Sequence, residues 1–419
     1  MRLPALWCAL LLGAASAWAQ NSGLPAVTEE TAAAFEAIKA GALEPDSALR
    51  AAACESLRIF VQQHPAAAQA PEALAMLAGQ EDRRAAIVDW LHLAYEYPAS
   101  PLARQAKSEY LDLVKGKMKR RMQAAMSVLV QAPESADLAD RLAQVVYGLA
   151  ENSGDALYEP AVAEARRFQV RFPAFHDGDR ILWSLARLHL ADGKNAAALM
   201  AYRQLAAYRG SPYREQAQFA VGALLADRLK KFKEAAEAFQ EFIMQFPQSA
   251  EIPRVLERLA VLYADRFDQP ALAVETYERI IKSYPKSDYA LKAFNGEAKL
   301  QRGRLKQPLE AMKTWQRLTE QFRYPEAVAA LLAAAEIARK DLKDYKQEVE
   351  LRMKIASDFP AVTEAAEQLY QAAQVTEYDL NDSSGAVKIY RQVVALVPAD
   401  KLGRKARDRA DKLEPKKSP

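Results

Sequence analysis

Cysteine and glycine are both scarce in this sequence. Only 2 of its 419 residues are cysteine and only 15 are glycine. Cys8 lies in the first ten residues, so a cut behind that segment would leave Cys54 as the single cysteine and exclude an internal disulfide. The low glycine content argues against an all-β sandwich or barrel, which needs many tight turns.

An excess of one charge sign is also missing. The chain has 57 basic and 54 acidic residues, which gives a formal net charge of +3. A nucleic-acid-binding domain usually has a strongly basic surface. We therefore expect no nucleic-acid partner.

Catalytic motifs are absent as well. There is no Walker loop, dinucleotide-binding glycine motif, HExxH, CxxC or GxSxG elbow. Ser283 and Lys286 have the SxxK spacing of a serine acylase but lack its companion motifs. The four histidines fall in different segments and form no pair at i, i+4 (His64, His92, His176 and His189). We predict a protein that is not an enzyme and has no cofactor and no metal.

Alanine and proline, in contrast, are abundant. Alanine accounts for 84 residues, and it has the highest helix propensity of all residues. The 21 prolines look excessive for a helical chain until their positions are compared. Ten of them recur at intervals of 33 to 40 residues: Pro65, Pro98, Pro133, Pro173, Pro212, Pro247, Pro285, Pro325, Pro360 and Pro398. Because proline cannot continue a helix, the spacing predicts tandem units of two helices each.

The units between these prolines resemble the tetratricopeptide repeat (TPR) family. The segment from Asp179 to Pro212 has small and large residues in the family's order, with no gaps: Leu182, Leu185, Ala186, His189, Gly193, Ala198, Tyr202 and Leu205. A later segment repeats the pattern with Leu256, Leu259, Ala260, Tyr263, Ala273, Tyr277, Ile280 and Pro285. The resemblance is close over residues 179–398 and more divergent over residues 28–178.

This resemblance implies the fold. We expect an all-α, right-handed superhelical solenoid of about ten helix-turn-helix repeats. Small residues would let paired helices approach closely, and aromatic residues would fill the space against the next unit. Each unit would then bury its apolar face against its neighbours.

The N-terminus has the pattern of an export signal. Met1 and Arg2 precede an apolar stretch, and Ala17-Trp18-Ala19 is a small-x-small cleavage site. We expect residues 1–19 to be a signal peptide and residues 20–27 a short polar leader. The alternative is a membrane anchor, but the apolar stretch is shorter than the ~20 residues a span needs. We expect no transmembrane span in the mature chain.

The C-terminal segment, residues 399–419, is basic, with eight Lys or Arg against four acidic residues. Residues 401–413 are typical of a polar capping helix, which the end of a solenoid requires for solubility. The alternative role is contact with an anionic lipid or polymer.

The resemblance also implies a binding surface, because the first helix of each unit lines the concave face in this family. Carried over, this gives the following candidate partner-binding residues: Arg180, Trp183, Arg187, Arg254, Glu257, Lys292, Asn295, Lys299 and Arg302. Arginine side chains in such a row could bind peptide carboxylates in pairs. A tryptophan could act as an aromatic anchor.

The junctions of the form aromatic-Pro-x-Ser, as in Tyr284-Pro285-Lys286-Ser287, resemble those of bacterial periplasmic and outer-membrane TPR proteins of the BamD-like and CpoB-like (YbgF) kind. The chain lacks the lipobox of the first and the coiled coil of the second. We expect an exported scaffold or adaptor, periplasmic or peripheral at the outer membrane, that binds envelope proteins or peptides through its concave face. The alternative is the handling of an anionic envelope polymer, such as polysaccharide or peptidoglycan, or of lipid.

Overall fold

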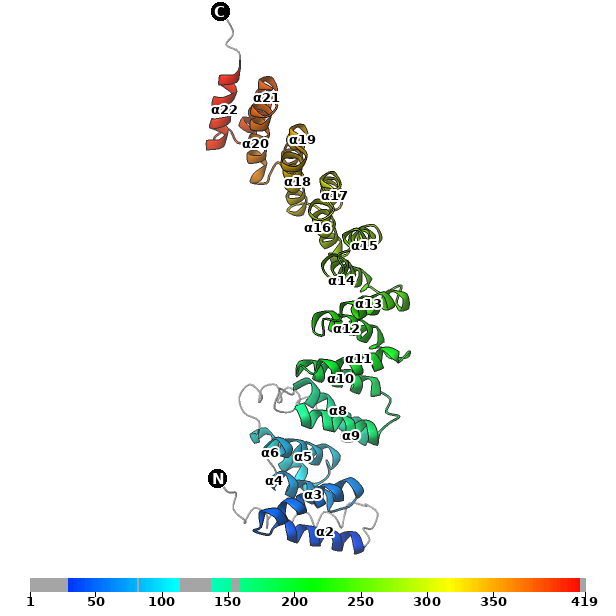
Figure 1. Cartoon of the computed structure of the whole chain (residues 1–419). Helices are drawn as coiled ribbons and strands as arrows, with labels where there is room; N and C mark the ends of the chain where they lie inside the picture. Colours follow the sequence, from blue (N-terminus) through cyan, green and yellow to red (C-terminus); the bar gives the residue numbers. More distant parts are fainter. Residues whose placement is uncertain (1–28, 81–82, 114–136, 153–157, 415–419) are drawn as a thin grey trace, which may run out of the picture. The chain divides into compact units, whose positions relative to one another are not determined.

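The computed structural model describes residues 29–80, 83–113, 137–152 and 158–414. These ranges are helical throughout, and no strand occurs within them (Figure 1). The expected all-α solenoid is therefore confirmed. The predicted signal peptide (1–19) and polar leader (20–27) lie outside the described residues. Among the described helices, none combines the length and the apolar character that crossing a bilayer requires.

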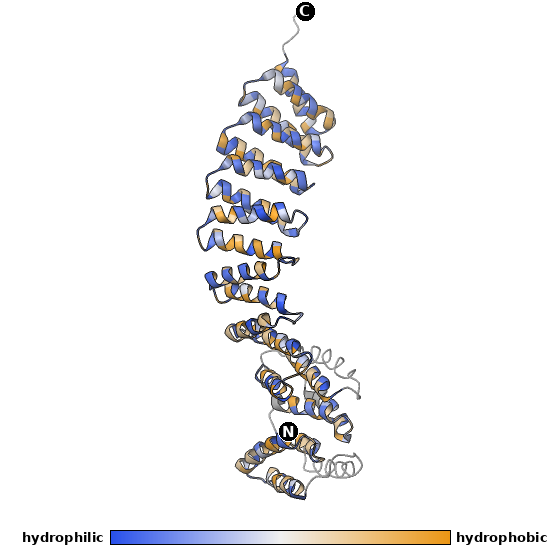
Figure 2. Ribbon diagram, turned by 90° about the vertical axis from the view of Figure 1, so that its right-hand side faces the viewer, coloured by the Kyte–Doolittle hydropathy of each residue, from blue (hydrophilic) through white to orange (hydrophobic). Residues whose placement is uncertain are grey.

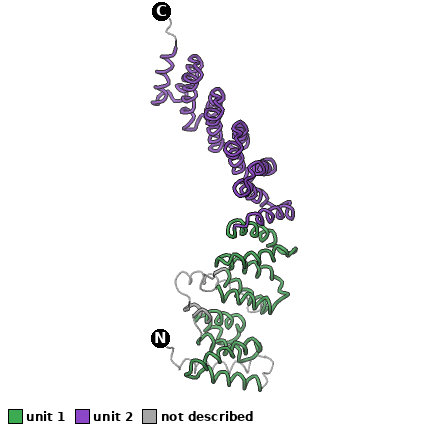
Figure 3. Tube along the Cα trace, in the orientation of Figure 1, with its two compact units in different colours: residues 1–229 green, residues 230–419 purple. Residues whose placement is uncertain are grey.

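The chain divides into two compact units, Met1–Leu229 and Lys230–Pro419 (Figure 3). The described helices of unit 1 are α2 (Glu29–Ala42), α3 (Ser47–Gln63), α4 (Ala70–Gln80), α5 (Arg83–Glu96), α6 (Pro101–Leu113), α8 (Leu138–Asn152), α9 (Tyr158–Arg171), α10 (Gly178–Ala191), α11 (Asn195–Ala207) and α12 (Arg214–Asp227). Most pack against the next helix in sequence, and α5 also packs against α8 and α9.

Unit 2 is a regular stack of helical hairpins. Its helices are α13 (Phe232–Gln245), α14 (Ile252–Asp265), α15 (Pro270–Ser283), α16 (Asp288–Gly303), α17 (Pro308–Gln321), α18 (Glu326–Ile337), the π-helix η2 (Ala338–Leu342), α19 (Tyr345–Asp358), α20 (Glu364–Tyr378), α21 (Ser383–Leu396) and α22 (Lys401–Leu413). From α14 to α21 each α-helix packs against the one before and the one after it. Apolar and polar residues alternate around the helices, so each contributes an apolar side to the stack (Figure 2).

The recurring prolines lie in the junctions between hairpins, as the sequence predicts. At His64, Phe172, Phe246, Tyr284 and Phe359 the helix ends, and proline follows directly. In each case the carbonyl of that last residue accepts a hydrogen bond from the backbone N–H three residues later, at 3.0 to 3.2 Å. Proline suits this position because its fixed φ matches the second residue of a tight turn. Pro133 lies outside the described residues.

A second periodic feature lies in the turns inside the hairpins from α10 to α21. One residue there has a left-handed backbone with φ between 53° and 74°, at intervals of 37 or 38 residues: Gly193, Lys230, Asp268, Lys306, Lys343 and Asn381. Only the first is glycine, although side chains with a Cβ are strained in this conformation. The hairpin turn is therefore set by the repeat geometry more than by the identity of its residue.

The packing positions of the repeat pattern are buried. Ala198 and Ala273 have no exposed surface, and Tyr202 and Tyr277 are almost covered. A close approach between helices involves Gly296 in α16, where a Cβ atom would lie 2.5 Å from Cζ of Tyr277. A larger residue there would force the Tyr277 ring to move.

At the C-terminal end α22 covers Lys401–Leu413 and packs on α20 and α21. Ala406 and Ala410 face the stack and are fully buried. Arg409 donates hydrogen bonds to the buried carboxylate of Glu377, one of them from Nε at 3.0 Å. The exposed side of this helix carries most of the basic residues of the C-terminal segment.

Candidate functional site

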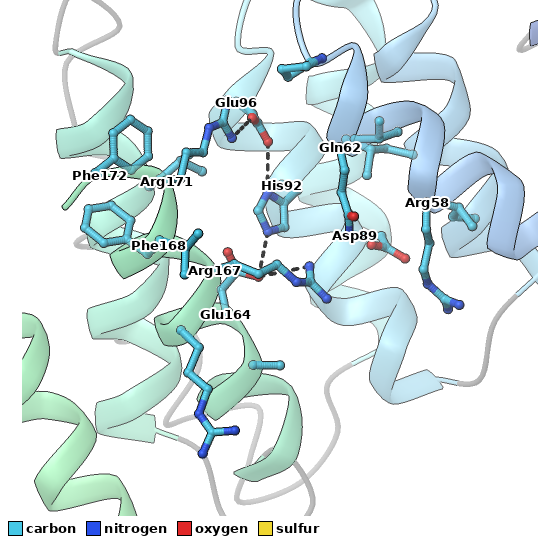
Figure 4. Close-up of a pocket in the computed structure, with 18 residues that line it drawn as sticks. Arg58, Gln62, Asp89, His92, Glu96, Glu164, Arg167, Phe168, Arg171 and Phe172 are labelled. Carbon is cyan, nitrogen blue, oxygen red and sulfur yellow. Dashed lines mark hydrogen bonds and ion pairs between the residues drawn. The ribbon is translucent and has the colours of Figure 1, made fainter. Parts of the chain in front are cut away.

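A buried charged cluster in unit 1 joins α5 to α9 (Figure 4). His92 and Glu96 lie on α5 at i, i+4, which places both side chains on one face of the helix. The same helical spacing, at i, i+3 and i+7, places three side chains on one face of α9: Glu164, Arg167 and Arg171. The packing of α5 on α9 brings the two faces together.

The imidazole of His92 lies between two carboxylates. Its Nδ1 is 3.0 Å from Oε2 of Glu96, and its Nε2 is 2.9 Å from Oε2 of Glu164. The side chains are largely covered, with 11% of His92 and 5% of each glutamate exposed. Arg171 pairs with Glu96, and Nη1 of Arg167 lies 3.4 Å from Glu164. The cluster thus links two helices distant in sequence through alternating charges.

These contacts favour the protonated imidazole. Burial acts to lower the pKa of His92, but the charges and hydrogen bonds of Glu164 and Glu96 outweigh it and raise the pKa well above its usual value. Burial acts to raise the pKa of the two glutamates. His92 and the neighbouring arginines nevertheless hold the pKa of both Glu96 and Glu164 below the usual range. The three groups are therefore charged together at neutral pH.

Asp89, one turn before His92, behaves differently. Burial raises the pKa of its carboxyl to about 6, against the opposing charges of His92, Arg58 and Arg167. Its Oδ2 atom is buried and has no hydrogen-bond partner among the described residues. Such an atom is costly to bury unless something donates a hydrogen bond to it.

The cluster forms one side of a cavity of about 680 Å³ between α3, α5 and α9. Its apolar lining includes Val61, Leu74, Leu77, Leu142, Phe168, Val170 and Phe172. The charged lining consists of Arg58, Asp89, His92, Glu96, Glu164, Arg166, Arg167 and Arg171. A concave, mainly apolar site with a few polar groups is typical of ligand and peptide binding.

Two of the three carboxylates that line the cavity, those of Glu96 and Glu164, are paired with basic groups. A protonated imidazole has no lone pair to act as a general base. Among the described residues that line the cavity there is no serine, threonine or cysteine nucleophile. No three His, Cys, Asp or Glu side chains in the described part of the chain are arranged to hold a metal ion.

Sequence reasoning missed this cluster. Local signals exist, namely the i, i+4 pair of His92 and Glu96 and the charged face of α9. They do not show that α5 and α9 meet, because that contact comes from the packing of hairpins far apart in sequence. His189, expected as a packing residue, is buried and lies with Nδ1 2.8 Å from the hydroxyl of Tyr158.

The predicted concave-face residues of α10 lie in unit 1 and differ in exposure. Arg180 stacks over the ring of Tyr147 at 4.0 Å and lies 3.6 Å from Asp177. Trp183 is partly buried, with its ring stacked on Tyr213 at 5.5 Å between centroids. Arg187 is exposed. The tryptophan thus already packs within the fold.

The other predicted residues lie in unit 2. On α14, Arg254 is exposed and lies 3.1 Å from Glu251, and Glu257 is half-buried. On α16, Lys292 and Lys299 are exposed, while the amide of Asn295 donates to the carbonyl of Leu291 at 2.7 Å.

Arg302 is the member of this set that has a clear structural role. It lies 3.3 Å from Glu336 and 2.8 Å from Asp341, both in the next hairpin. It therefore ties α16 to the segment of α18 and η2. Whether the remaining residues bind a partner stays a prediction.

The tetratricopeptide repeat family model matches residues 254–287, which include the hairpin of α14 and α15. The match lies in one of the most regular parts of the array. It supports the assignment of the array to TPR-type repeats. It does not distinguish a BamD-like from a CpoB-like kind. No curated protein is significantly similar to this chain.

Several solved structures show distant similarity. A tetratricopeptide repeat protein from Parabacteroides merdae has 13% identity and a TM-score of 0.35, over 65% of this chain and 98% of its own. Pseudomonas aeruginosa PilF has 18% identity and a TM-score of 0.33, over 56% of this chain and 96% of its own. The Rap conjugation gene regulator of plasmid pLS20, solved with the Phr* peptide, has 10% identity and a TM-score of 0.27, over 78% and 96%. At such low scores these likenesses say nothing about what this chain binds.

Proposed function

We propose that this protein is an exported, non-enzymatic scaffold that binds proteins or peptides in the cell envelope. The main support is the stack of TPR-type hairpins, an architecture that presents extended surfaces to protein partners. The cavity of unit 1 adds a concave site in which His92, Glu96 and Glu164 are paired with one another.

The envelope location rests on the N-terminal sequence. Cleavage after Ala19 would leave Gln20 as the first residue of the mature chain. The mass of the protein purified from the envelope fraction tests this: it should correspond to a chain that starts at Gln20. A protein that keeps residues 1–19 and stays in the cytoplasm would contradict the proposed location.

The scaffold role is tested by chemical cross-linking in intact cells followed by mass spectrometry. We expect one or a few envelope proteins to be linked reproducibly to the array. Cells that carry the same chain without residues 2–19 serve as a control, because the protein should then meet no envelope partner. Failure to recover any envelope protein would remove most support for the proposal.

The handling of an anionic envelope polymer is the second candidate. Its support is the exposed basic side of α22 together with the exposed Arg254 and Lys292. A glycan pull-down with Arg180, Arg254 and Lys292 all changed to Glu is the test. Unchanged retention would argue against this candidate.

A further inference from the structure

Unit 1 has a second cavity next to the one described above. It has a volume of about 620 Å³ and lies between α9, α10 and α11. Its lining includes Leu182, Leu185, Met200 and Ala201, and its charged residues are Arg166 and Arg203. Arg166 on α9 lines both cavities, so they adjoin each other on the two sides of this helix.

The rims of both cavities expose apolar side chains. Val170, at the C-terminal end of α9, lines the first cavity and is 83% exposed. Met200 on α11 lines the second and is 64% exposed. Both side chains are accessible to a partner that covers the cavities.

The charges around the two cavities are unbalanced in favour of the positive sign. Five arginines and the protonated His92 face three acidic residues, namely Asp89, Glu96 and Glu164. Two of those acids are already paired with His92, Arg167 and Arg171. Arg58 is also paired, with Glu55 on α3. The exposed Arg166, which lines both cavities, is therefore the arginine best placed to pair with a carboxylate of a partner.

We propose that the two cavities form one docking surface for an extended, acidic segment of a partner protein with two apolar side chains. One apolar side chain would enter each cavity, and a carboxylate between them would pair with Arg166. The inference rests on the proposed scaffold function, because it names the kind of segment that the scaffold binds.

The geometry of α9 sets the spacing of the two apolar side chains. A helix with its side chains is about 10–12 Å across. An extended chain rises about 3.3 Å per residue, and alternate residues face the same side. Two apolar side chains about four residues apart would thus reach both cavities from one face of an extended segment.

The test uses the mature full-length protein and three fluorescein-labelled peptides, with binding measured by fluorescence anisotropy. The first, Glu-Leu-Glu-Ser-Glu-Leu-Glu, has the proposed charge and spacing. The second replaces each Glu by Lys, and the third replaces each Leu by Ser. We expect the first to bind and the other two to bind at least about tenfold more weakly. Failure of the first peptide to bind, or equal binding of either control, would overturn the proposal.

Two variants locate the binding. Arg166→Glu and Val170→Asp change exposed side chains, so we expect both to fold with an unchanged melting temperature. Each should weaken the first peptide about tenfold or more. The matched controls, Arg279→Glu on α15 and Met244→Asp on α13, make the same changes at exposed positions of unit 2.

Undiminished binding by Arg166→Glu and Val170→Asp would contradict the proposed surface. The proposed scaffold function would not be contradicted by this result if cross-linking still recovers envelope partners. Tight binding of the serine-substituted peptide would instead indicate a general polyanion site and would also contradict the proposal.

Discussion

At the scale of single residues, His92 shows how a buried charge can stabilise a contact between helices. A buried imidazolium is unfavourable by itself, since burial removes its hydration. Here carboxylates on both sides compensate, and arginines compensate the carboxylates in turn. Removing a single partner from such a buried group is costly because it leaves an uncompensated charge.

Replacing Glu164 by Gln should lower the pKa of His92, because the largest favourable contribution to its protonation is the charge of Glu164. NMR titration of the His92 imidazole measures this directly. Glu55→Gln is the control, since Glu55 is exposed on α3 and makes no contact with the imidazole. An unchanged pKa of His92 in Glu164→Gln would show that the cluster does not form.

The same cluster predicts a pH dependence of stability. The pKa of His92 is raised in the fold, so its contribution is complete below the unfolded value of about 6.5 and is lost as pH rises through the folded pKa. The pKa values of Glu96 and Glu164 are lowered, so their contributions are lost as pH falls below about 4.5. The melting temperatures of the wild type and of His92→Gln can be compared across this pH range. The difference between them should be smallest at alkaline pH. A difference independent of pH would contradict this assignment.

Gly296 gives a second prediction at this scale. Alanine normally stabilises a helix relative to glycine by up to about 1 kcal/mol. Gly296→Ala should instead destabilise the protein by about 1–3 kcal/mol, because the new Cβ would collide with Tyr277. Gly303→Ala in the same helix has open space around it and should be neutral or stabilising. Urea unfolding of both variants gives the comparison, and equal effects would contradict the packing described.

At the scale of elements, the repeat depends on two kinds of turn, and only one of them could be predicted. The junction between hairpins has a constant residue, proline, so its period is visible in the sequence. The turn within a hairpin has a constant backbone shape but a varied residue, including lysine, aspartate and asparagine. A pattern of residue types cannot reveal a position that is defined by φ alone.

The left-handed lysines should therefore respond to glycine in an unusual way. Lys306→Gly should raise the free energy of unfolding by up to about 1 kcal/mol, since glycine has no Cβ strain at φ 56°. Lys313→Gly, in the interior of α17, should lower it by about 1 kcal/mol. Chemical denaturation measures both. A loss of stability in Lys306→Gly as large as that in Lys313→Gly would contradict the strain argument.

At the scale of the whole molecule, the sequence predicts the all-α stack because periodicity and burial agree in every regular unit. The cavities of unit 1 could not be predicted. They depend on how α9 packs against α5 and α10, and sequence periodicity does not specify which faces of separate hairpins meet. The predicted row of basic residues shows the same limit, since Arg302 turned out to bridge two hairpins.

Stability in such an array should be local, because each unit contacts mainly its neighbours. Removing residues 401–419 deletes α22 and uncovers the ends of α20 and α21. Hydrogen exchange should then increase in these two helices and stay unchanged in α14 and α15. A uniform increase along unit 2 would contradict this picture of nearest-neighbour stabilisation.

The central claim is that this array is an envelope scaffold that binds a partner protein over the cavities of unit 1. Photo-cross-linking in intact cells tests it most directly, with a photoreactive residue placed in the full chain at Val170 and, for comparison, at Met244. We predict that the residue at Val170 gives a discrete adduct with an envelope protein, that Arg166→Glu abolishes it, and that the residue at Met244 does not give it. No adduct at Val170, or adducts with cytoplasmic proteins alone, would contradict the claim.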